Sequence, residues 1–384
     1  MFLSTNKKII DFIKNLYPGK EFIPLHEPLF VGKERAYLLD AIDSNFVSSV
    51  GRYVDRFEQM IQDYTGAKFA IATTNGTSAL HMSLMLAGVE QDDMVITQPF
   101  SFVATCNAIS YLKACPYFID IDDNTLGLSY DALNFFLSDH TFIKNHQCYH
   151  KETNRRISAC VPMHTFGMPV EIDKIVSICE EYHIKVVEDA AESLGSTYKG
   201  QQTGTFGLLG TYSFNGNKTI TCGGGGIIVT NNERLGKLAK HLTTQAKLPH
   251  KWEFKHDQIG YNYRLPNINA ALACAQMEQL DNFISNKRET ANKYAEFFEP
   301  FTNINFLKEN QNSKSNYWLN AILFEDHNSQ QEFLEYSNSN GVMTRPGWDI
   351  LNTLPMYPDQ INDELVNARK IQARLVNIPS SVRK

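Results

Sequence analysis

The sequence predicts an α/β protein with a large, mostly parallel sheet and a smaller C-terminal α/β domain. Short apolar runs alternate with helix-like runs from about residue 68 to 240, which is typical of a parallel sheet covered by helices. From about residue 281 onward, Asn, Lys and Glu become commoner and the alternation weakens. We therefore expect a large domain at 1–280, including the N-terminal segment, and a small domain at 281–384.

The expected strands follow one another along the large domain. Each is a short apolar run bounded by polar residues, glycine or proline. The helix expected at 171–183 is amphipathic, with Ile172, Ile175 and Cys179 on one side. The polar stretch 145–156 is expected to form a hairpin excursion. The strands are expected at 70–73, 94–97, 115–120, 158–162, 185–188, 210–214 and 226–230.

Composition excludes several classes of protein. The 384 residues carry 36 basic and 42 acidic side chains without a basic run, so nucleic acid is not an expected partner. No apolar stretch is long enough to span a bilayer, and the N-terminus does not resemble a signal peptide, so no membrane association is expected. The 7 cysteines are scattered without a CxxC pair. We expect free thiols in a reducing cytoplasm and no metal site.

The most informative segment contains Lys218 and ends in four consecutive glycines, 223–226. Such a run indicates that backbone passes close to something or adopts positive φ. A lysine held against a sheet loses its proton more easily than one in water, and the neutral amine forms Schiff bases. The alternative is a plain glycine turn with a solvated lysine. A nucleotide-triphosphate loop does not fit, because Asn217 separates Gly216 from the lysine.

Two acidic residues follow the strand expected at 185–188. Asp189 lies at the carboxyl end of a buried parallel strand, where open α/β sheets bind ligands. It could pair with a pyridinium nitrogen, or equally well cap a following helix. Glu192 lies three residues further on and could face the same ligand.

Polar and aromatic residues follow other strands. In 75–78, a strand runs through small residues into a helix, an arrangement that can bind an anion, although the motif taken alone favours simple helix capping. Phe102 follows the next strand and could be core or could stack on a flat ring. His164 ends another strand, although a lone histidine is more often structural. Together these groups are expected at one edge of the sheet.

Five segments follow one another along the chain: NGTSAL, PFSFVAT, VVEDAAESLG, YSFNGNKTITCGGGG and GYNYRLPNINAA. In this order they resemble the DegT/DnrJ/EryC1/StrS sugar aminotransferases, and the resemblance extends from Pro28 to the C-terminal 377–381. It implies the aspartate aminotransferase-like architecture, fold type I of the enzymes that use pyridoxal 5'-phosphate (PLP).

The resemblance implies roles for residues around the cofactor ring. Lys218 matches the lysine that forms the Schiff base with PLP. Asp189 matches the partner of the pyridine nitrogen, and Phe102 matches the aromatic that stacks on the ring. Glu192 takes the place where many relatives have Gln, near the ring oxygen.

A second set of matches implies a phosphate site and a shared active site. Gly76, Thr77 and Ser213 match phosphate ligands. Asn262 resembles a residue that reaches the phosphate from the neighbouring subunit, with Arg264 as a second candidate. The resemblance therefore implies a homodimer with shared active sites, in agreement with the prevalence of symmetric dimers.

Several segments look like the branch that acts on UDP-linked 4-keto-6-deoxy-N-acetylhexosamines in the legionaminic acid and bacillosamine pathways. This implies transfer of an amino group from L-glutamate to C4 of the sugar, with pyridoxamine phosphate as the intermediate form of the cofactor. His164 is expected to touch a sugar hydroxyl or the cofactor oxygen. The segments are PLHEPLFVGKE, FVSSVGRYVDRFE, VPMHTFGMP and SFNGNK, and the candidate diphosphate contacts are Arg52, Lys247, His250 and Lys251.

Two rival functions remain at this point. A PLP-dependent sugar dehydratase is the nearest, and relatives of that kind can carry His where this chain has Lys218. A non-catalytic regulator with the same fold is the other. The sequence contains nothing that resembles an appended DNA-binding domain.

Overall fold

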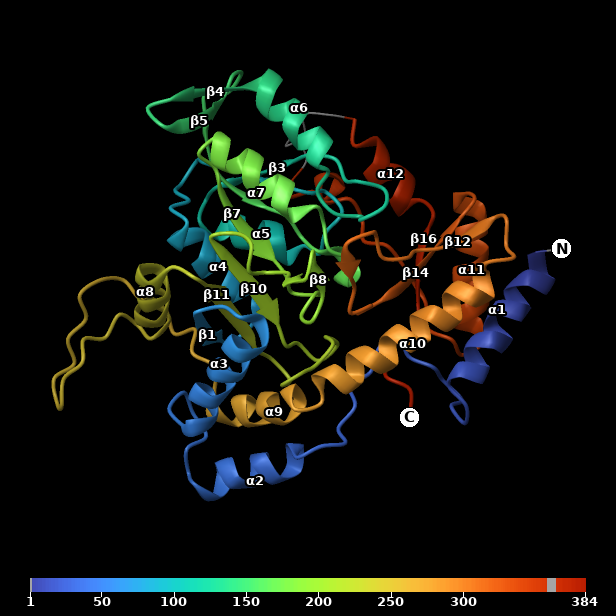
Figure 1. Ribbon diagram of the computed structural model, residues 1–384, viewed down its shortest axis with the longest axis horizontal. Helices are drawn as coiled ribbons and strands as arrows, with labels where there is room; N and C mark the ends of the chain where they lie inside the picture. The colour runs from blue at the N-terminus through green and yellow to red at the C-terminus, as the bar shows by residue number, and fades with distance from the viewer. Residues whose placement is uncertain (1, 358–363) are drawn as a thin grey trace.

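A large mixed sheet and a smaller C-terminal sheet organise the chain in the computed structural model, which describes residues 2–357 and 364–384 (Figure 1). The large sheet is nine-stranded, with the order β1-β11-β10-β7-β6-β2-β3 and the β4–β5 hairpin attached to β6. All strands of this order are parallel to one another except β11, which confirms the predicted fold class. The strands are β1 (Phe69–Thr73), β2 (Met94–Thr97), β3 (Cys115–Phe118), β4 (Thr141–Lys144), β5 (Gln147–His150), β6 (Arg156–Val161), β7 (Lys185–Asp189), β10 (Leu209–Ser213) and β11 (Gly226–Thr230).

The observed strands differ from the expected ones by at most two residues at either end. The hairpin begins earlier than expected, because β4 already starts at Thr141. Its turn consists of Asn145 and His146, which both have positive φ, and Lys144 pairs with Gln147. Two successive residues with positive φ make the type of turn that matches the twist of a two-stranded ribbon.

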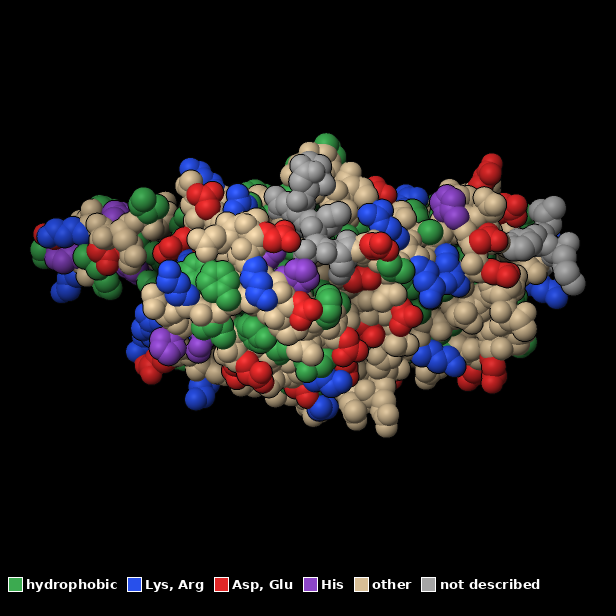
Figure 2. All heavy atoms as spheres, turned by 90° about the horizontal axis from the view of Figure 1, so that it is seen from above, with side chains coloured by type: hydrophobic (Ala, Val, Ile, Leu, Met, Phe, Trp, Pro, Cys, Tyr) green, Lys and Arg blue, Asp and Glu red, His purple; other side chains and the backbone are tan. Residues whose placement is uncertain are grey.

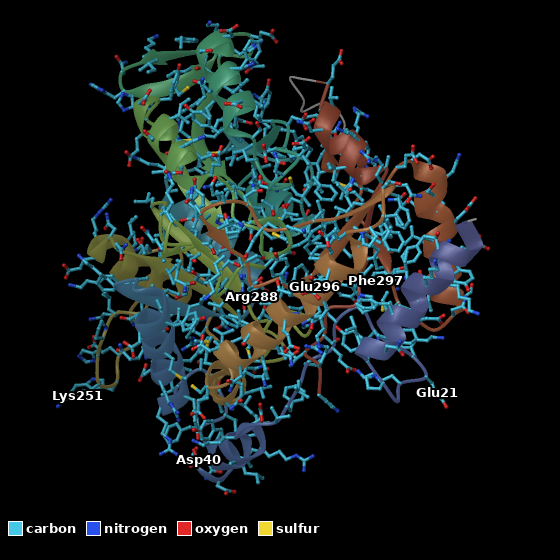
Figure 3. All side chains as sticks on the ribbon, turned by 45° about the vertical axis from the view of Figure 1, so that its right-hand side comes forward. Glu21, Asp40, Lys251, Arg288, Glu296 and Phe297 are labelled. Atoms are coloured by element: carbon cyan, nitrogen blue, oxygen red, sulfur yellow. The ribbon has the colours of Figure 1, made fainter. Side chains whose placement is uncertain are left out.

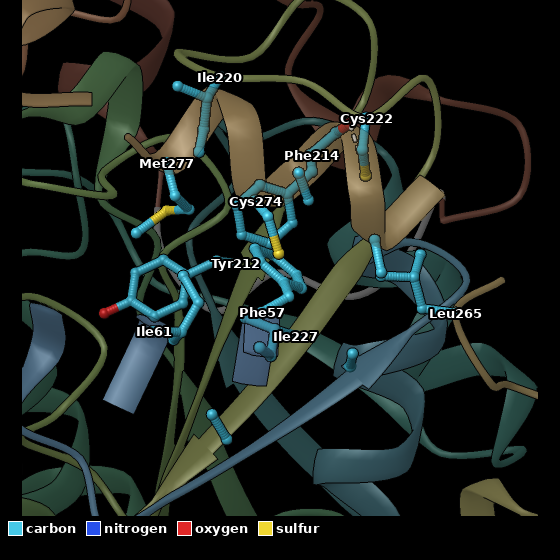
Figure 4. Close-up of a cluster of buried hydrophobic side chains, with 14 of the residues drawn as sticks. Phe57, Ile61, Tyr212, Phe214, Ile220, Cys222, Ile227, Leu265, Cys274 and Met277 are labelled. Carbon is cyan, nitrogen blue, oxygen red and sulfur yellow. Dashed lines mark hydrogen bonds between the residues drawn. The ribbon is translucent and has the colours of Figure 1, made fainter. Parts of the chain in front are cut away.

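Helices cover both faces of the large sheet (Figure 1). On one face, Phe57 of α3 packs edge-on against Phe214, with ring centroids 4.9 Å apart (Figure 4). Residues of α9 such as Cys274 complete this cluster. On the other face, α4 packs against β10 and β11, and α8 packs against β11 and the edge strand β1. The helices are α2 (Glu34–Asp43), α3 (Arg52–Thr65), α4 (Gly76–Leu86), α5 (Ala104–Tyr111), α6 (Tyr130–His140), α7 (Ile172–Glu181), α8 (Glu233–Thr243) and α9 (Asn267–Met277).

The helix α10 (Leu280–Phe298) runs from the large sheet to the C-terminal sheet (Figure 1). That sheet is four-stranded, in the order β12-β14-β16-β15, and a separate three-stranded sheet has the order β13-β8-β9. The remaining elements are β8 (Thr197–Tyr198), β9 (Gln201–Gln202), β12 (Ile304–Phe306), β13 (Ser313–Lys314), β14 (Asn320–Phe324), α11 (His327–Ser339), β15 (Arg345–Pro346), α12 (Val366–Gln372) and β16 (Leu375–Ile378), with 3-10 turns at Thr165–Gly167 and Leu351–Thr353.

The first helix, α1 (Phe2–Leu16), packs on the C-terminal sheet, whereas the sequence suggested that this segment belongs with the large domain. Phe12 stacks on Phe297 of α10 with ring centroids 4.0 Å apart (Figure 3). Ile9 and Ile13 are fully buried in the same cluster as Phe333 of α11. The helix is amphipathic, and such a pattern indicates that one side is buried without indicating against which partner.

A long arm, residues 245–261, projects from the large domain after α8 (Figures 1 and 2). Thr244 and Asn262 close its base as an isolated antiparallel bridge, and Lys251 lies near its tip (Figure 3). Trp252 is 74% exposed and Phe254 80%. Such exposure of large apolar side chains on one projection indicates a surface for protein contact.

No helix among residues 2–357 and 364–384 has the length and apolar character needed to cross a bilayer. The 7 cysteines are all unpaired, and Cys115 alone among them is not buried.

Candidate active site

A cavity of about 360 Å³ lies at the carboxyl ends of β1, β7 and β10. This is the edge at which open α/β sheets bind their ligands. Side chains from the C-terminal domain complete its wall. The predicted residues that line the cavity are Gly76, Thr77, Phe102, Asp189, Glu192, Ser213 and Lys218.

Lys218 lies in the loop between β10 and β11, and its side chain is only 13% exposed. Its Nζ is 3.2 Å from Oε1 of Glu192 and 4.1 Å from the ring centroid of Trp318. The amine is in contact with a carboxylate on one side and an indole face on the other. The amine is thus held in the cavity by protein contacts, so the alternative of a solvated surface lysine does not apply.

Asp189 is the last residue of β7 and is 6% exposed. Its Oδ2 accepts a hydrogen bond of 2.8 Å from the hydroxyl of Thr105, and its Oδ1 accepts one of 3.2 Å from the backbone N–H of Ala191. The residues after it form turns, so the alternative role as a helix cap does not apply. A carboxylate fixed in this way can accept from a protonated ring nitrogen in the cavity.

Glu192 is the second buried carboxyl of the site. Its Oε2 accepts a hydrogen bond of 2.9 Å from the backbone N–H of Phe166, opposite the contact of Oε1 with Lys218. Burial raises the pKa of Glu192 to about 7, although the Lys218 ammonium opposes this shift. The side chain can therefore exchange a proton near neutral pH.

The turn between β1 and α4 forms the other end of the cavity. Asn75 caps α4, because its side chain accepts a hydrogen bond of 2.7 Å from the N–H of Ser78. A Cβ at Gly76 would lie 2.9 Å from the Cβ of Ser213, so only glycine fits beside that side chain. The N–H groups of a helix N-terminus and nearby hydroxyls bind phosphate.

The glycine run packs against the backbone of this turn. A Cβ at Gly226 would lie 2.3 Å from the backbone of Asn75, and Gly223 has a φ of +82°. Both reasons expected for the run, close approach and positive φ, are therefore present. The backbone that approaches so closely is that of the phosphate-type turn, so the run shapes the turn and does not itself line the cavity.

Aromatic side chains surround the centre of the cavity. Phe102 is 51% exposed and lines it, in a position where its ring can face a planar ligand. Trp318 and Trp348 line it as well, and sequence reasoning missed both. They lie more than 90 residues beyond Lys218 in the C-terminal domain, and no motif in the sequence connected them to it.

Trp318 is tied directly to the loop that carries the lysine. Its Nε1 donates a hydrogen bond of 2.7 Å to the carbonyl of Asn217. Its backbone N–H donates to the side chain of Asn316, which in turn donates to the carbonyl of Glu192 at 2.9 Å. The C-terminal domain thus positions both Lys218 and its carboxyl partner.

His164 does not line the cavity, although the sequence suggested a contact with substrate. It is fully buried, and its Nε2 lies 3.1 Å from Oε2 of Glu188. Its Nδ1 accepts from the backbone N–H of Val170 at 3.3 Å, so Nε2 carries the proton and donates it to the carboxylate. With both nitrogens engaged inside the core, the ring holds Glu188 in place.

Asn262 and Arg264 lie outside the cavity of their own chain, near the base of the arm. Asn262 is exposed, and Arg264 lines a separate hollow of about 160 Å³ beside Gly51. The basic residues considered for a diphosphate are also elsewhere. Arg52 pairs with Asp40 at 2.5 Å, and Lys247, His250 and Lys251 belong to the arm.

The residues of the cavity fit PLP. The β1–α4 turn with Ser213 would hold its phosphate, Asp189 would pair with its pyridine nitrogen, and Lys218 would bind its aldehyde carbon. Three separate donors and acceptors thus match three distant groups of one molecule. Gly76 and Gly226 matter to this fit because side chains there would clash with the turn.

Comparisons with known proteins agree with this geometry. Residues 30–383 match the DegT/DnrJ/EryC1/StrS aminotransferase family. The chain is 35% identical over 360 residues to GDP-perosamine synthase of Escherichia coli O157:H7, which covers 94% of this chain and 93% of that one. It is 36% identical over 335 residues to EpsN of Bacillus subtilis, provisionally named a pyridoxal phosphate-dependent aminotransferase, with 87% and 84% covered.

Solved structures give the same fold. PseC of Helicobacter pylori, an aminotransferase involved in the biosynthesis of pseudoaminic acid, superposes with a TM-score of 0.84 at 24% identity over 94% of each chain. The family match covers almost the whole sequence, and the lysine and the aspartate line the same cavity. The chain therefore belongs to the DegT/DnrJ/EryC1/StrS family and is a pyridoxal phosphate-dependent aminotransferase.

Proposed function

We propose that this enzyme transfers the amino group of L-glutamate to C4 of a UDP-linked 2-acetamido-2,6-dideoxy-4-keto-hexose, for glycans of the legionaminic acid or bacillosamine type. The observation that carries the aminotransferase part is the position of Lys218, which lines one cavity together with Asp189 and the phosphate-type turn. The sugar and the nucleotide rest on the resemblance of several sequence segments to that branch. The name GDP-perosamine synthase, carried by a relative at 35% identity, makes a GDP-linked sugar the competing substrate.

PLP, when bound, supplies a conjugated ring that takes up electron density from the carbon that loses a proton. Asp189 keeps the pyridine nitrogen protonated, and Thr105 holds the carboxylate in the required orientation with its 2.8 Å hydrogen bond. Phe102, Trp318 and Trp348 line the cavity and would present aromatic faces to the ring. These groups act by position and charge.

Lys218 is the proton carrier in both halves of the reaction. With PLP bound, the amine of Lys218 would remove the proton from the carbon of the amino donor and pass it to the cofactor. In the second half the same amine would take that proton back and deliver it to the sugar carbon that receives the amino group. Glu192 lies 3.2 Å away and can accept or release the compensating proton near neutral pH.

The homodimer with shared active sites is part of this proposal. The arm exposes Trp252, Phe254 and Ile259, the last at 85%. Asn262 at its base lies outside the cavity of its own chain and is free to reach that of a partner. Burial of the arm against a second copy would remove these apolar side chains from water.

The function is tested by the visible absorption of the purified protein. Wild-type enzyme should be yellow and should bleach when L-glutamate is added, whereas Lys218→Ala should lose the lysine-linked absorption and all turnover. Borohydride reduction followed by peptide mass spectrometry should place the cofactor on Lys218. Labelling of a different lysine would refute the assignment. A non-catalytic regulator would not bleach with glutamate, and a dehydratase would release a deoxygenated sugar without a new amine.

The substrate is tested by a kinetic comparison of nucleotide keto sugars. The UDP N-acetyl 4-keto sugar is compared with a GDP-linked 4-keto-6-deoxyhexose, dTDP 4-keto-6-deoxyglucose and a 3-keto isomer. We expect the highest kcat/KM for the UDP compound, with the new amine at C4 by product NMR. A clear preference for one of the others would refute the substrate while leaving the aminotransferase activity intact.

A further inference from the structure

A second hollow of about 500 Å³ adjoins the cofactor cavity on the side of the C-terminal domain. The two share Phe102, Asn217, Trp318 and Trp348 in their walls. A substrate that reacts at Lys218 can therefore extend directly into the second hollow. The larger volume lies on the side away from the phosphate-type turn, so it is left free when the cofactor is bound.

The wall between the two compartments is rigid. The indole of Trp348 packs on Phe166 and Phe100, with ring centroids 4.8 Å and 5.6 Å apart. The residue before it is Gly347, at which a Cβ would lie 2.6 Å from the ring of Phe100. The backbone is thus pressed against the large domain, and the flat indole is held ready for a ligand.

The residues that line this hollow include a cation, Arg345. Arg345 begins β15, pairs through its backbone with Asn377, and is exposed. Its Nη1 donates a long hydrogen bond of 3.4 Å to the carbonyl of Thr344. Within residues 2–357 and 364–384, no carboxylate lies at ion-pair distance from it. Its guanidinium therefore retains donors for a ligand, and its planar fork matches phosphate oxygens.

We infer that this hollow binds the nucleoside diphosphate portion of the substrate, with Arg345 on the diphosphate and Trp348 as the flat wall beside it. This inference rests on the proposed function, because it states where the nucleotide of the proposed sugar substrate binds. Asp349 also lines the hollow and would repel a phosphate at its own position. Its carboxylate instead suits the hydroxyl or ring N–H donors of the nucleoside.

The carboxylate of L-glutamate is the other source of an oxyanion for Arg345, and the two sources can be separated by experiment. Binding of GDP and of UDP to the cofactor-loaded protein is measured by titration calorimetry, and the glutamate dependence of bleaching is measured on the same samples. Arg345→Ala should weaken binding of at least one nucleotide on the order of 10- to 100-fold, the usual effect of losing a hydrogen bond to a charged group. The nucleotide affinity of Arg345→Lys should lie between those of wild type and Arg345→Ala, because lysine keeps the positive charge but lacks the planar fork of donors.

A matched control is Arg234→Ala, which removes an exposed arginine on α8 that lines neither compartment. It should leave both measurements unchanged. If Arg345→Ala raises the glutamate requirement and leaves nucleotide binding unchanged, the donor occupies the site and the inference is refuted. It is also refuted if neither quantity changes. If wild type bleaches with glutamate but binds no nucleotide, both this inference and the nucleotide-sugar substrate fail, while the aminotransferase activity stands.

Discussion

The environment of Glu192 leads to a quantitative prediction for Glu192→Gln. The carboxyl is almost fully buried, and burial raises its pKa to about 7. Its two described contacts are the Lys218 ammonium and the backbone N–H of Phe166. An amide can still accept from Phe166, so the substitution removes the titration with little change in shape. The prediction concerns the protein without cofactor, because bound PLP changes the charges around this group.

The sign follows from the proton balance. The folded-state pKa is about 7 and the ordinary value is 4.5, so between these values the folded protein holds a proton that the unfolded chain has released. This contribution to wild-type stability is present below pH 4.5 and is lost as the pH rises through 7. The difference of the two pKa values, at roughly 1.4 kcal/mol for each pH unit, corresponds to about 3.5 kcal/mol in full, of which about 3 kcal/mol falls above pH 5.

The assay compares urea midpoints of wild type and Glu192→Gln, both without cofactor, from pH 5 to pH 8.5. The variant should gain stability relative to wild type across this range, by up to about 3 kcal/mol. The matched control is Glu171→Gln, which removes an exposed glutamate that pairs with Lys174. Its difference from wild type should stay nearly constant. Parallel curves for Glu192→Gln would mean that this carboxyl titrates normally, and the proposed proton exchange with Lys218 would then have no basis.

Three further predictions concern other parts of the molecule. Asp189→Asn should still bind PLP but lose orders of magnitude in kcat, because a neutral amide does not keep the pyridine nitrogen protonated; near-normal turnover would contradict its role. Burial lowers the pKa of Lys287 to about 7, so above that pH the unfolded state binds more protons than the folded state. The free energy of unfolding of wild type, measured in urea, should therefore rise relative to that of Lys287→Met by up to about 3 kcal/mol between pH 7 and 9. A flat difference would show that the amine is charged when buried. Light scattering should show a dimer for wild type and a more readily dissociated dimer for Trp252→Ser. A separate titration should show that Asn262→Ala binds PLP more weakly. An active monomer would exclude the shared site.

The strands of the large sheet could be predicted because the residues next to each strand in the sequence determine where it begins and ends. The strands Met94–Thr97 and Gly226–Thr230 have the expected limits, since each apolar run is bounded by polar residues, proline or glycine. The sequence indicated that the glycine run passes close to another group, but it did not identify that group as the backbone of Asn75. Residues that follow strand ends were expected to meet because parallel strands share an edge, which is a consequence of topology.

Contacts between distant segments could not be predicted in the same way. Trp318 and Trp348 reach the cavity only through the packing of the C-terminal domain, and their local sequences suggest ordinary core residues. His164 was expected near the substrate because it follows a strand, yet its side chain points into the core toward Glu188. The position along the strand fixes the edge at which a residue lies, whereas side-chain direction depends on partners that the sequence does not identify.

The C-terminal domain is part of the catalytic centre, because its hydrogen bonds end on the loop that holds the lysine. Trp318 donates to the carbonyl of Asn217, the residue immediately before Lys218, and Asn316 donates to the carbonyl of Glu192. The carbonyl of Trp318 itself accepts from the buried amine of Lys287 at 3.1 Å, on the helix that joins the domains. A shift of the C-terminal domain would therefore move the indole and the lysine together. The geometry of proton transfer at Lys218 then depends on domain packing as much as on the large sheet, so substitutions far from the cavity along α10 can change kcat without touching substrate.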